Sequence, residues 1–397
     1  MSNAIGMLLA TLSLLLASGC ATGPTAPSMP PAADLFSDAH FQAPAQPVRA
    51  DRLFSLSEPM KAHLNSPAFR AQLKLTSPQQ GLFEALYKKG NLKLQYDAEV
   101  TRDAAGTFAA GKGNCLSLII MTAAFARALG LDVVFQAVEV EDQWSRKGNM
   151  YVASAHVNLR LPMDGATLGS HVRGRNSLTI DFVPPEDSAR FLVQPIDEKT
   201  VVAMFLNNRA AEELAADRID QAYWFARAAI DNNPSYVVAY NTLGVIYQRR
   251  GELALAERVY KRALERERED TIVMHNLVPV LARLGKADES KALAARLASL
   301  EPVAPFYYFQ KGVLAMEESR YHDARRLFAR EVQRSPYYHE FHFWLALAHL
   351  RLGETQLAND AMARAVDTST TDSATRLYSA KLAHLRSLAA DLRRRVY

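Results

Sequence analysis

The sequence predicts an α+β domain at residues 51–200, followed by an all-α solenoid of helical repeats at residues 201–371. In the first region a nearly continuous apolar helix precedes stretches that alternate apolar and polar residues, which is typical of a sheet packed against a buried helix. In the second region small residues and prolines recur at a spacing of 34 positions, which is typical of stacked helix pairs. A length of 397 residues is consistent with two or three domains.

The composition excludes several classes of protein. Apolar residues make up 49% of the chain and charged residues 22%, which are ordinary proportions for a globular protein and exclude a disordered chain or one with many membrane spans. The net charge is only +4, so we expect no basic surface for nucleic acid. Two cysteines, Cys20 and Cys115, are too few for a disulfide framework.

Residues 1–19 have the features of an export signal. Residues 4–17 form an apolar run rich in Leu, which is too short to span a membrane because a spanning helix needs about 20 apolar residues. The run leads into Leu16-Ala17-Ser18-Gly19-Cys20, which resembles the lipobox of bacterial lipoproteins. This resemblance implies a signal peptide at residues 1–19 and a lipid on Cys20. The alternative is an apolar N-terminal helix with an incidental cysteine.

Residues 20–50 are expected to be a tether. Ala, Pro, Thr and Ser dominate this segment, which predicts an extended linker without a core of its own. Cys20 is followed by Ala21 and Thr22 rather than by Asp, which resembles an outer-membrane signal in enterobacterial lipoproteins. We therefore expect a lipoprotein of the bacterial cell envelope, attached to the outer membrane and facing the periplasm.

Boundary residues place the elements of the α+β domain. Ser57 and Pro59 favour the start of a helix, and a second short helix is expected at residues 79–89. Asn114 as the N-cap and Gly130 as the C-terminal stop delimit the buried central helix. The alternating runs predict an antiparallel sheet packed against this helix, with strands at residues 131–140, 151–161 and 177–183.

Cys115 lies in the first turn of the central helix. The unpaired N–H groups and the positive end of the helix dipole favour a thiolate there, and nearby Lys112 is expected to add to the effect. The position therefore suits a nucleophile. The alternative is an inert buried cysteine, which is the commoner role of a free thiol.

His156 and Asp181 can complete a catalytic group with Cys115. His156 alternates with Val157 on one predicted strand, and Asp181 alternates with Ile180 on the next, so the two polar side chains can meet on neighbouring strands. Thiol chemistry needs a base that takes the proton of the cysteine and a carboxylate that orients this base. The alternative is that both are structural residues.

The order of these residues resembles the bacterial transglutaminase-like fold, which is papain-like. The resemblance is carried by Gly113-Asn114-Cys115-Leu116-Ser117-Leu118, then His156-Val157 and Asp181-Phe182, and it covers roughly residues 80–190. It implies a Cys-His-Asp triad with Cys115 as the nucleophile, His156 as the general acid and base, and Asp181 as the residue that orients it.

The same resemblance implies an acyl-thioester intermediate and no cofactor or metal. We expect the Cys115 backbone N–H and an upstream side chain, Tyr96 or Gln95, to stabilise the oxyanion. Trp144 lies between the cysteine and the histidine in the sequence and can border the acyl site. Alternatively, Trp144 is a surface aromatic residue that covers the edge of the sheet.

The repeats begin near residues 203, 237, 271, 305 and 339. The second copy contains Tyr240, Leu243, Gly244 and Tyr247 and closely resembles the tetratricopeptide repeat. Such arrays present a concave surface, so we expect five repeats that bind a protein partner; the alternative is an array that only stiffens or dimerises the protein. A capping helix is expected at residues 372–397.

His339, His342 and His349 are close together in the fifth repeat. His342 and His349 occupy the repeat positions of Tyr240 and Tyr247, so they are expected to line the helix packing. No metal site is expected here, because the spacing of known zinc motifs is missing.

Two functions follow from these observations. The first is an exported, lipid-anchored thiol acyl enzyme, a cysteine peptidase, amidase or acyltransferase that acts on peptide or protein amides, while the repeats recruit a substrate or partner. The second is a scaffold lipoprotein without catalytic turnover, whose repeats mediate protein–protein interaction. The intact triad favours the first.

Overall fold

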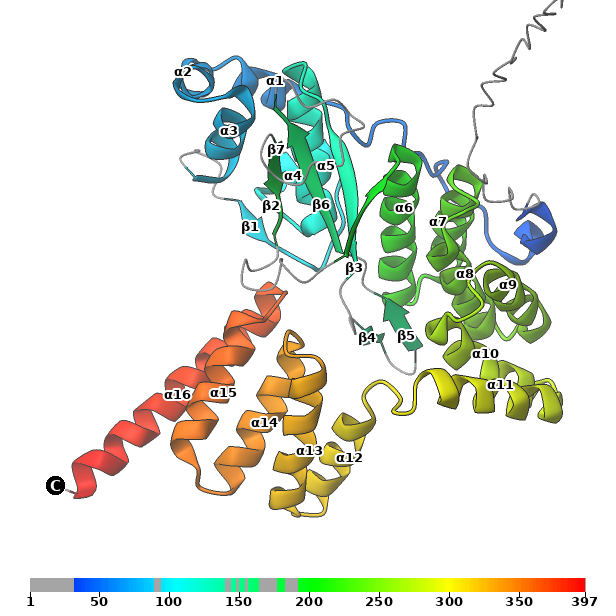
Figure 1. Ribbon diagram of the computed structural model, residues 1–397, viewed down its shortest axis with the longest axis vertical. Coiled ribbons are helices and arrows are strands. Elements are labelled where there is room, and N and C mark those ends of the chain that lie inside the picture. The colour runs from blue at the N-terminus through cyan, green and yellow to red at the C-terminus, as the bar shows by residue number, and fades with distance from the viewer. Residues whose placement is uncertain are drawn as a thin grey trace, which may run out of the picture.

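The computed structural model describes residues 32–88, 94–139, 144–147, 150–153, 156–163, 177–182 and 192–396. The predicted signal peptide, Cys20 and the first part of the predicted linker lie outside these residues. The described chain forms an α+β region and an array of antiparallel helices (Figure 1). No helix within the described residues is both long and apolar enough to span a membrane.

Six short helical segments build one side of the α+β region. Ser66, Ser77 and Asp103 each cap a helix by accepting a hydrogen bond from a backbone N–H, as their residue types favour. The helices are α1 Glu58–Leu64, α2 Pro67–Leu75, α3 Pro78–Phe83 with its π-helical continuation η3 Glu84–Lys88, α4 Ala104–Ala110 and α5 Cys115–Ala128.

A four-stranded antiparallel sheet in the order β7-β6-β3-β8 packs against α5. Its strands are β3 Val134–Glu139, β6 His156–Pro162, β7 Ser177–Ile180 and β8 Leu192–Ile196, and two smaller sheets pair β1 Gln95–Tyr96 with β2 Lys112–Gly113 and β4 Trp144–Lys147 with β5 Met150–Ala153. The expected strand at 151–161 is thus divided between β5 and β6. Strand β8 was not expected; its Pro195 is tolerated because β8 lies at the sheet edge.

The repeat array contains five helix pairs and a final long helix. The pairs are α6 Glu198–Ala215 with α7 Ile219–Asn232, α8 Val237–Arg250 with α9 Leu253–Arg266, α10 Thr271–Arg283 with α11 Ala287–Leu300, α12 Tyr307–Glu317 with α13 Tyr321–Arg334, and α14 His339–Arg351 with α15 Thr355–Asp367; α16 Asp372–Val396 follows. The predicted all-α solenoid is confirmed.

Small residues allow the two helices of each repeat to approach closely. The residues expected at these crossings are all buried: Ala222, Ala256, Ser290, Ala324 and Ala358. Gly244 has the same role, since a Cβ atom placed there would lie 2.4 Å from the ring of Tyr260. The 34-residue period therefore reflects the packing of each pair.

The first helix of the array is shared with the α+β region. Val201 and Met204 of α6 are buried in the same hydrophobic core as Phe125 of α5 and Leu159 of β6. At its other end the array returns to the α+β region, so that α16 begins beside the loop that follows β1 (Figure 1). There the Ala98 N–H donates a hydrogen bond to the Thr370 carbonyl at 2.9 Å.

Residues 32–42 differ from the predicted extended linker. They contain two short 3₁₀ helices, η1 Ala32–Leu35 and η2 Asp38–His40, which lie against α7, α8 and α9 on the side away from the sheet (Figure 1). Leu35 and Phe41 are buried in the core of the array. These apolar side chains hold the segment against the array, which the Pro- and Ala-rich composition alone did not indicate.

Candidate active site

The nucleophile candidate Cys115 is the first residue of α5 and is partly exposed. Asn114 caps the helix: its side-chain oxygen accepts hydrogen bonds from the Ser117 N–H at 2.9 Å and from the Ser117 hydroxyl at 2.8 Å. Behind Cys115, α5 is buried on all sides from Leu116 to Ala126. The thiol is therefore held at the positive end of a helix dipole by a helix that cannot shift easily.

His156 and Asp181 meet as their positions on neighbouring strands predicted. His156 is the first residue of β6, Asp181 follows β7 directly, and the distance between His156 Nε2 and Asp181 Oδ1 is 2.6 Å. Asn158, on the same face of β6, donates a hydrogen bond to the other carboxylate oxygen at 3.0 Å. Both oxygens of Asp181 are thus engaged, which fixes the carboxylate relative to the imidazole.

The imidazole of His156 also hydrogen-bonds the Cys115 side chain. Burial by itself would lower the pKa of His156, but the hydrogen bonds to Asp181 and Cys115 and the charges of both groups outweigh it and raise the pKa to about 9. The imidazole is therefore protonated at neutral pH. A protonated histidine between a thiol and a carboxylate is the electrostatic arrangement that a thiolate nucleophile needs.

Tyr96 lies beside the nucleophile. Strand β1 pairs in parallel with β2 and places Tyr96 opposite Gly113, and the Tyr96 hydroxyl accepts a hydrogen bond from the Cys115 backbone N–H. Burial of this hydroxyl, followed by the nearby Cys115, raises the pKa of Tyr96 well above its ordinary value. The Tyr96 hydroxyl therefore lies next to the Cys115 N–H, and Tyr96 as a residue is 43% exposed.

Lys112, which the sequence suggested would favour a thiolate at Cys115, forms an ion pair with Asp97. Its ammonium lies 3.1 Å from the carboxylate of Asp97, which also pairs with Arg102 at 3.2 Å. Asp97 is 1% exposed, and although burial opposes it, the N–H of Glu99 and the two cations hold the pKa of this carboxyl below its ordinary value. Sequence analysis missed Asp97, although it directly follows Tyr96.

The loop at residues 97–102 joins the nucleophile helix to both ends of the array. On the helix side, Asn114 donates to the Thr101 hydroxyl at 2.8 Å, and the Arg102 N–H donates to the Ser117 hydroxyl at 2.8 Å. On the array side, the Thr101 N–H donates to Glu212 of α6 at 2.7 Å. The remaining contacts come from the turn before α16, where the Thr370 carbonyl and the Ser373 hydroxyl reach Ala98 and Glu99.

Trp144 and the three histidines of the fifth repeat were also singled out in the sequence. Trp144 begins β4, which is paired with β5, but its side chain lies outside the described residues. In the fifth repeat, His339 contacts Tyr378, His342 contacts the Pro336 carbonyl, and His349 contacts Glu354. Burial lowers the pKa of His342, as expected for a neutral side chain in helix packing.

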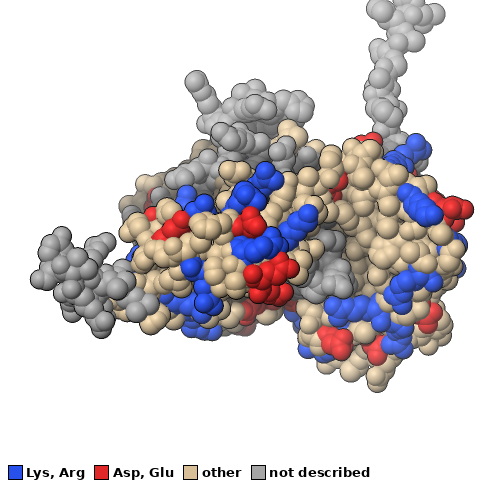
Figure 2. All heavy atoms as spheres, turned by 90° about the horizontal axis from the view of Figure 1, so that it is seen from below, with Lys and Arg blue, Asp and Glu red and all other residues tan. Residues whose placement is uncertain are grey.

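Within the described residues, neither the charged side chains nor the possible metal ligands indicate a second functional site. Within that part of the chain, no three His, Cys, Asp or Glu side chains are grouped so that they could hold a metal ion. Figure 2 shows one face of the molecule, on which acidic and basic side chains are interspersed rather than gathered into one basic surface.

Two family models match the array. Both are described as tetratricopeptide repeat, and they match residues 237–270 and 309–373. A comparison with curated protein sequences gives no match.

Solved structures similar to the array have low identity. A crystal structure of YrrB, described as a TPR protein with an unusual peptide-binding site, is 19% identical; the match covers 45% of this chain and 92% of that chain, with a TM-score of 0.25. The MamA protein is 15% identical, with coverages of 44% and 93% and a TM-score of 0.25. The two family models and the helix pairs show that the C-terminal half of this chain is an array of tetratricopeptide repeats.

Proposed function

We propose that this chain is a thiol acyl enzyme with a transglutaminase-like, papain-like domain, and that its tetratricopeptide repeats bind a protein partner or substrate. The observation that carries the catalytic part is the chain of contacts from Cys115 to His156 to Asp181. The family models support the protein-binding part. We further propose that the protein is exported and anchored by a lipid on Cys20 to the outer membrane, facing the periplasm.

The proposed reaction begins with attack by the Cys115 sulfur on an amide carbonyl of a peptide or protein. The oxyanion receives hydrogen bonds from the Cys115 N–H and the Tyr96 hydroxyl, which separate from each other to do so. The His156 imidazolium then gives its proton to the leaving amine, and an acyl-thioester remains on Cys115. His156 next removes a proton from water or from an acceptor amine, which attacks the thioester and restores the thiolate.

The test uses the soluble chain that starts after Cys20, in which Cys115 is the only thiol. Its labelling rate with a fluorescent iodoacetamide is compared with that of His156→Ala. We expect the variant to react at least tenfold more slowly at pH 7, because the imidazolium that stabilises the thiolate is lost. His384→Ala, on an exposed part of α16, is the matched control and should label at the parent rate.

The scaffold function is the second candidate, because the comparisons bear on the repeats and not on the triad. Slow labelling that is equal in the parent chain and in His156→Ala would favour this candidate. The lipid anchor has a separate test in the full-length chain: Cys20→Ser should move the protein from the membrane fraction to the soluble fraction. A variant that stays in the membrane fraction would contradict lipidation at Cys20.

A further inference from the structure

Residues 34–42 occupy an outer face of the first two repeats, which we call the docking face. It is formed by side chains of α7, α8 and α9: Tyr223, Trp224, Arg227, Tyr247, Arg250, Arg258 and Arg262. The contacts differ from the concave surface expected from the repeats, since most come from the second helix of each pair. The docking face therefore binds a segment of the same chain that contains two short 3₁₀ helices.

An aromatic anchor holds the end of the segment. The ring of Phe41 stacks on Tyr223 with a centroid distance of 3.8 Å and an interplanar angle of 2°, and the Arg250 guanidinium lies 4.8 Å from the centre of the Phe41 ring. Phe41 is thus enclosed between an aromatic ring and a cation. Phe36 makes a similar contact with Arg227 at 4.9 Å.

Two aspartates of the segment meet cations and hydroxyls of the docking face. Asp38 accepts a hydrogen bond from the Tyr223 hydroxyl at 2.6 Å and pairs with Arg227 at 3.0 Å. Asp34 pairs with Arg262 at 3.2 Å. The docking face therefore recognises negative charge at two positions along the segment.

The docking face also donates hydrogen bonds to backbone carbonyls of the segment. The Leu35 carbonyl accepts a hydrogen bond from the Tyr247 hydroxyl at 2.8 Å, and the Gln42 carbonyl accepts one from the Trp224 indole N–H at 2.7 Å. Arg258 donates to the Asp34 carbonyl. Contacts to backbone carbonyls can be made equally by any peptide that adopts the same path, so they do not require this particular chain.

Tyr223, Tyr247 and Arg250 are not repeated at the next equivalent position of the array, whereas Arg262 recurs as Arg296, Arg330 and Arg364. The positions 34 residues after Tyr223, Tyr247 and Arg250 hold Glu257, Leu281 and Leu284. Packing of the next repeat unit does not require Tyr223, Tyr247 or Arg250, because its equivalent positions hold other residues. Their presence at the docking face is explained by the segment that they bind.

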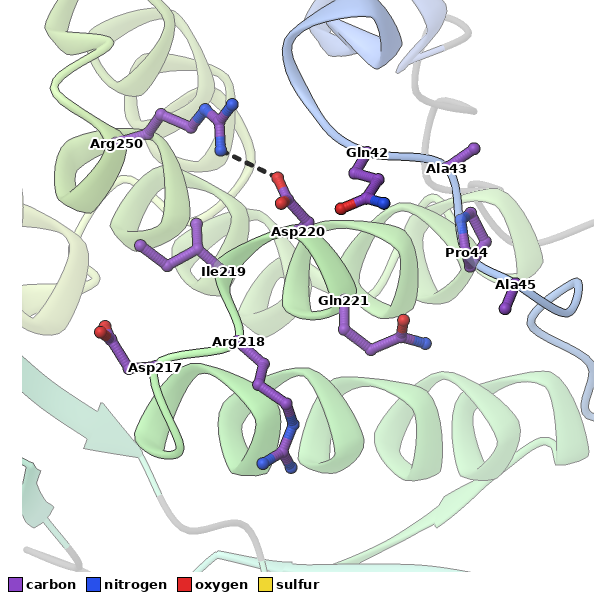
Figure 3. Close-up of a pocket in the computed structure, with 10 residues that line it drawn as sticks. All are labelled: Gln42, Ala43, Pro44, Ala45, Asp217, Arg218, Ile219, Asp220, Gln221 and Arg250. Atoms are coloured by element: carbon purple, nitrogen blue, oxygen red, sulfur yellow. Dashed lines mark hydrogen bonds and ion pairs between the residues drawn. The ribbon is translucent and has the colours of Figure 1, made fainter.

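A hollow continues the docking face beyond the segment. It has a volume of about 500 Å³ and lies between residues 42–45 of the segment and residues 217–221 at the start of α7 (Figure 3). Arg250 and Asp220, which form an ion pair at 2.8 Å, lie on its wall. The segment thus leaves polar space that a longer or bulkier peptide would contact.

We propose that the docking face is a peptide-binding site. Its ligand is a turn that carries an acidic side chain and an aromatic side chain, as Asp38 and Phe41 do in this chain. Residues 34–42 are its built-in ligand, and a partner peptide with an aspartate or glutamate three residues before an aromatic residue replaces them. This inference deepens the partner-binding part of the proposed function and is independent of the thiol chemistry.

The first test measures binding of a fluorescein-labelled peptide with the sequence of residues 32–45. The receptor is the soluble chain with Asp38→Lys and Phe41→Ser, which releases the built-in segment. We expect this chain to bind the peptide at least tenfold more tightly than the parent chain, because the tethered segment competes at a high effective concentration. A peptide that carries the same two changes is the control and should not bind.

A further substitution tests whether the peptide binds at the docking face. Adding Arg227→Glu to the released chain should weaken binding at least tenfold, while Arg296→Glu on α11, outside the docking face, should leave it unchanged. Absence of saturable binding to the released chain, or equal binding of the control peptide, would overturn the proposal. Concentration-dependent dimers of the parent chain that exchange this segment would also overturn it, because a second copy would then be the occupant.

The second test uses the parent chain without substitutions and therefore does not depend on the folding of a variant. Amides of residues 34–42 should exchange with deuterium faster than those of α8, and excess peptide should accelerate their exchange further. Protection equal to that of α8, unchanged by the peptide, would show an integral part of the core and contradict a replaceable ligand. Cys115 labelling is measured in parallel, so a failed catalytic proposal remains distinguishable from a failed docking proposal.

Discussion

In the repeat array the same packing contact recurs at intervals of the period, whereas each polar contact around Cys115 occurs once. The hydroxyl of Tyr240 donates to the Pro234 carbonyl, and three repeats later the imidazole of His342 makes the same contact with Pro336. Around Cys115, by contrast, Thr101, Asn114 and Glu212 form a network with no equivalent in the repeats. Repeated contacts tolerate substitution of one residue type for another, whereas a unique network requires particular atoms.

The largest expected effect concerns the polar contact between His156 and Asp181. Asp181→Asn should lower the labelling rate of Cys115 about a hundredfold, because the imidazole loses both its orientation and the charge that keeps it protonated. The measurement is the iodoacetamide rate at pH 7, with circular dichroism to verify that the array stays folded. A rate close to that of the parent chain would show that the carboxylate is structural.

A change in the repeated packing should lower stability without altering labelling. Gly244→Ala places a methyl group 2.4 Å from the buried ring of Tyr260, so we expect the free energy of unfolding to fall by about 2 kcal/mol. Gly312→Ala, which faces Phe328 at 2.5 Å, should have a similar effect. Gln356→Ala on an exposed turn of α15 is the control, and equal urea midpoints for all three would contradict the packing argument.

The pH dependence of stability separates the two regions further. The pKa of His156 is raised to about 9 from the ordinary value of 6.5. The protonated imidazole therefore stabilises the folded state fully below pH 6.5, and this stabilisation is lost as the pH rises through 9. We expect the free energy of unfolding to fall by up to about 3 kcal/mol across this window. Urea unfolding at both ends of the window measures it, and His156→Gln should remove most of the difference; an unchanged difference would assign it to other groups.

The smallest expected effect tests the link between the regions. Glu212→Ala removes the acceptor of the Thr101 N–H, and we expect the labelling rate of Cys115 to fall about threefold, equivalent to about 0.6 kcal/mol, because Thr101 positions the Asn114 cap. Glu198→Ala is the matched control on α6, since Glu198 pairs with Arg127 at the other end of α5. Equal rates in both variants would show that the array does not influence the site.

Much of the fold could be predicted because it depends on local rules. The 34-residue period predicted the helix pairs and their buried small residues, and the cap at Asn114 predicted the start of α5. The alternation along the two strands correctly predicted that His156 and Asp181 can meet. Strand β8 was missed because Pro195 argues against a strand unless the strand is known to be at an edge.

The contacts of Lys112 and of residues 32–42 could not be predicted in the same way. Helix-start position and sequence proximity suggested that Lys112 acts on Cys115, but no local pattern indicated its ion pair with Asp97, which forms because β1 pairs with β2. Likewise, the composition of residues 20–50 suggested an extended linker, and nothing local to Phe41 indicates Tyr223 as its partner.

The sequence by itself determined the period of the array, the capped helix that begins at Cys115 and the order of the three triad candidates, because these follow from spacing and local hydrogen bonding. Only the tertiary structure decided the other contacts across the chain: Asp97 with Lys112, Thr101 with Glu212, and the docked segment with α7–α9. Such contacts join residues that are distant in sequence, and their energy depends on burial and on geometry that no local pattern specifies.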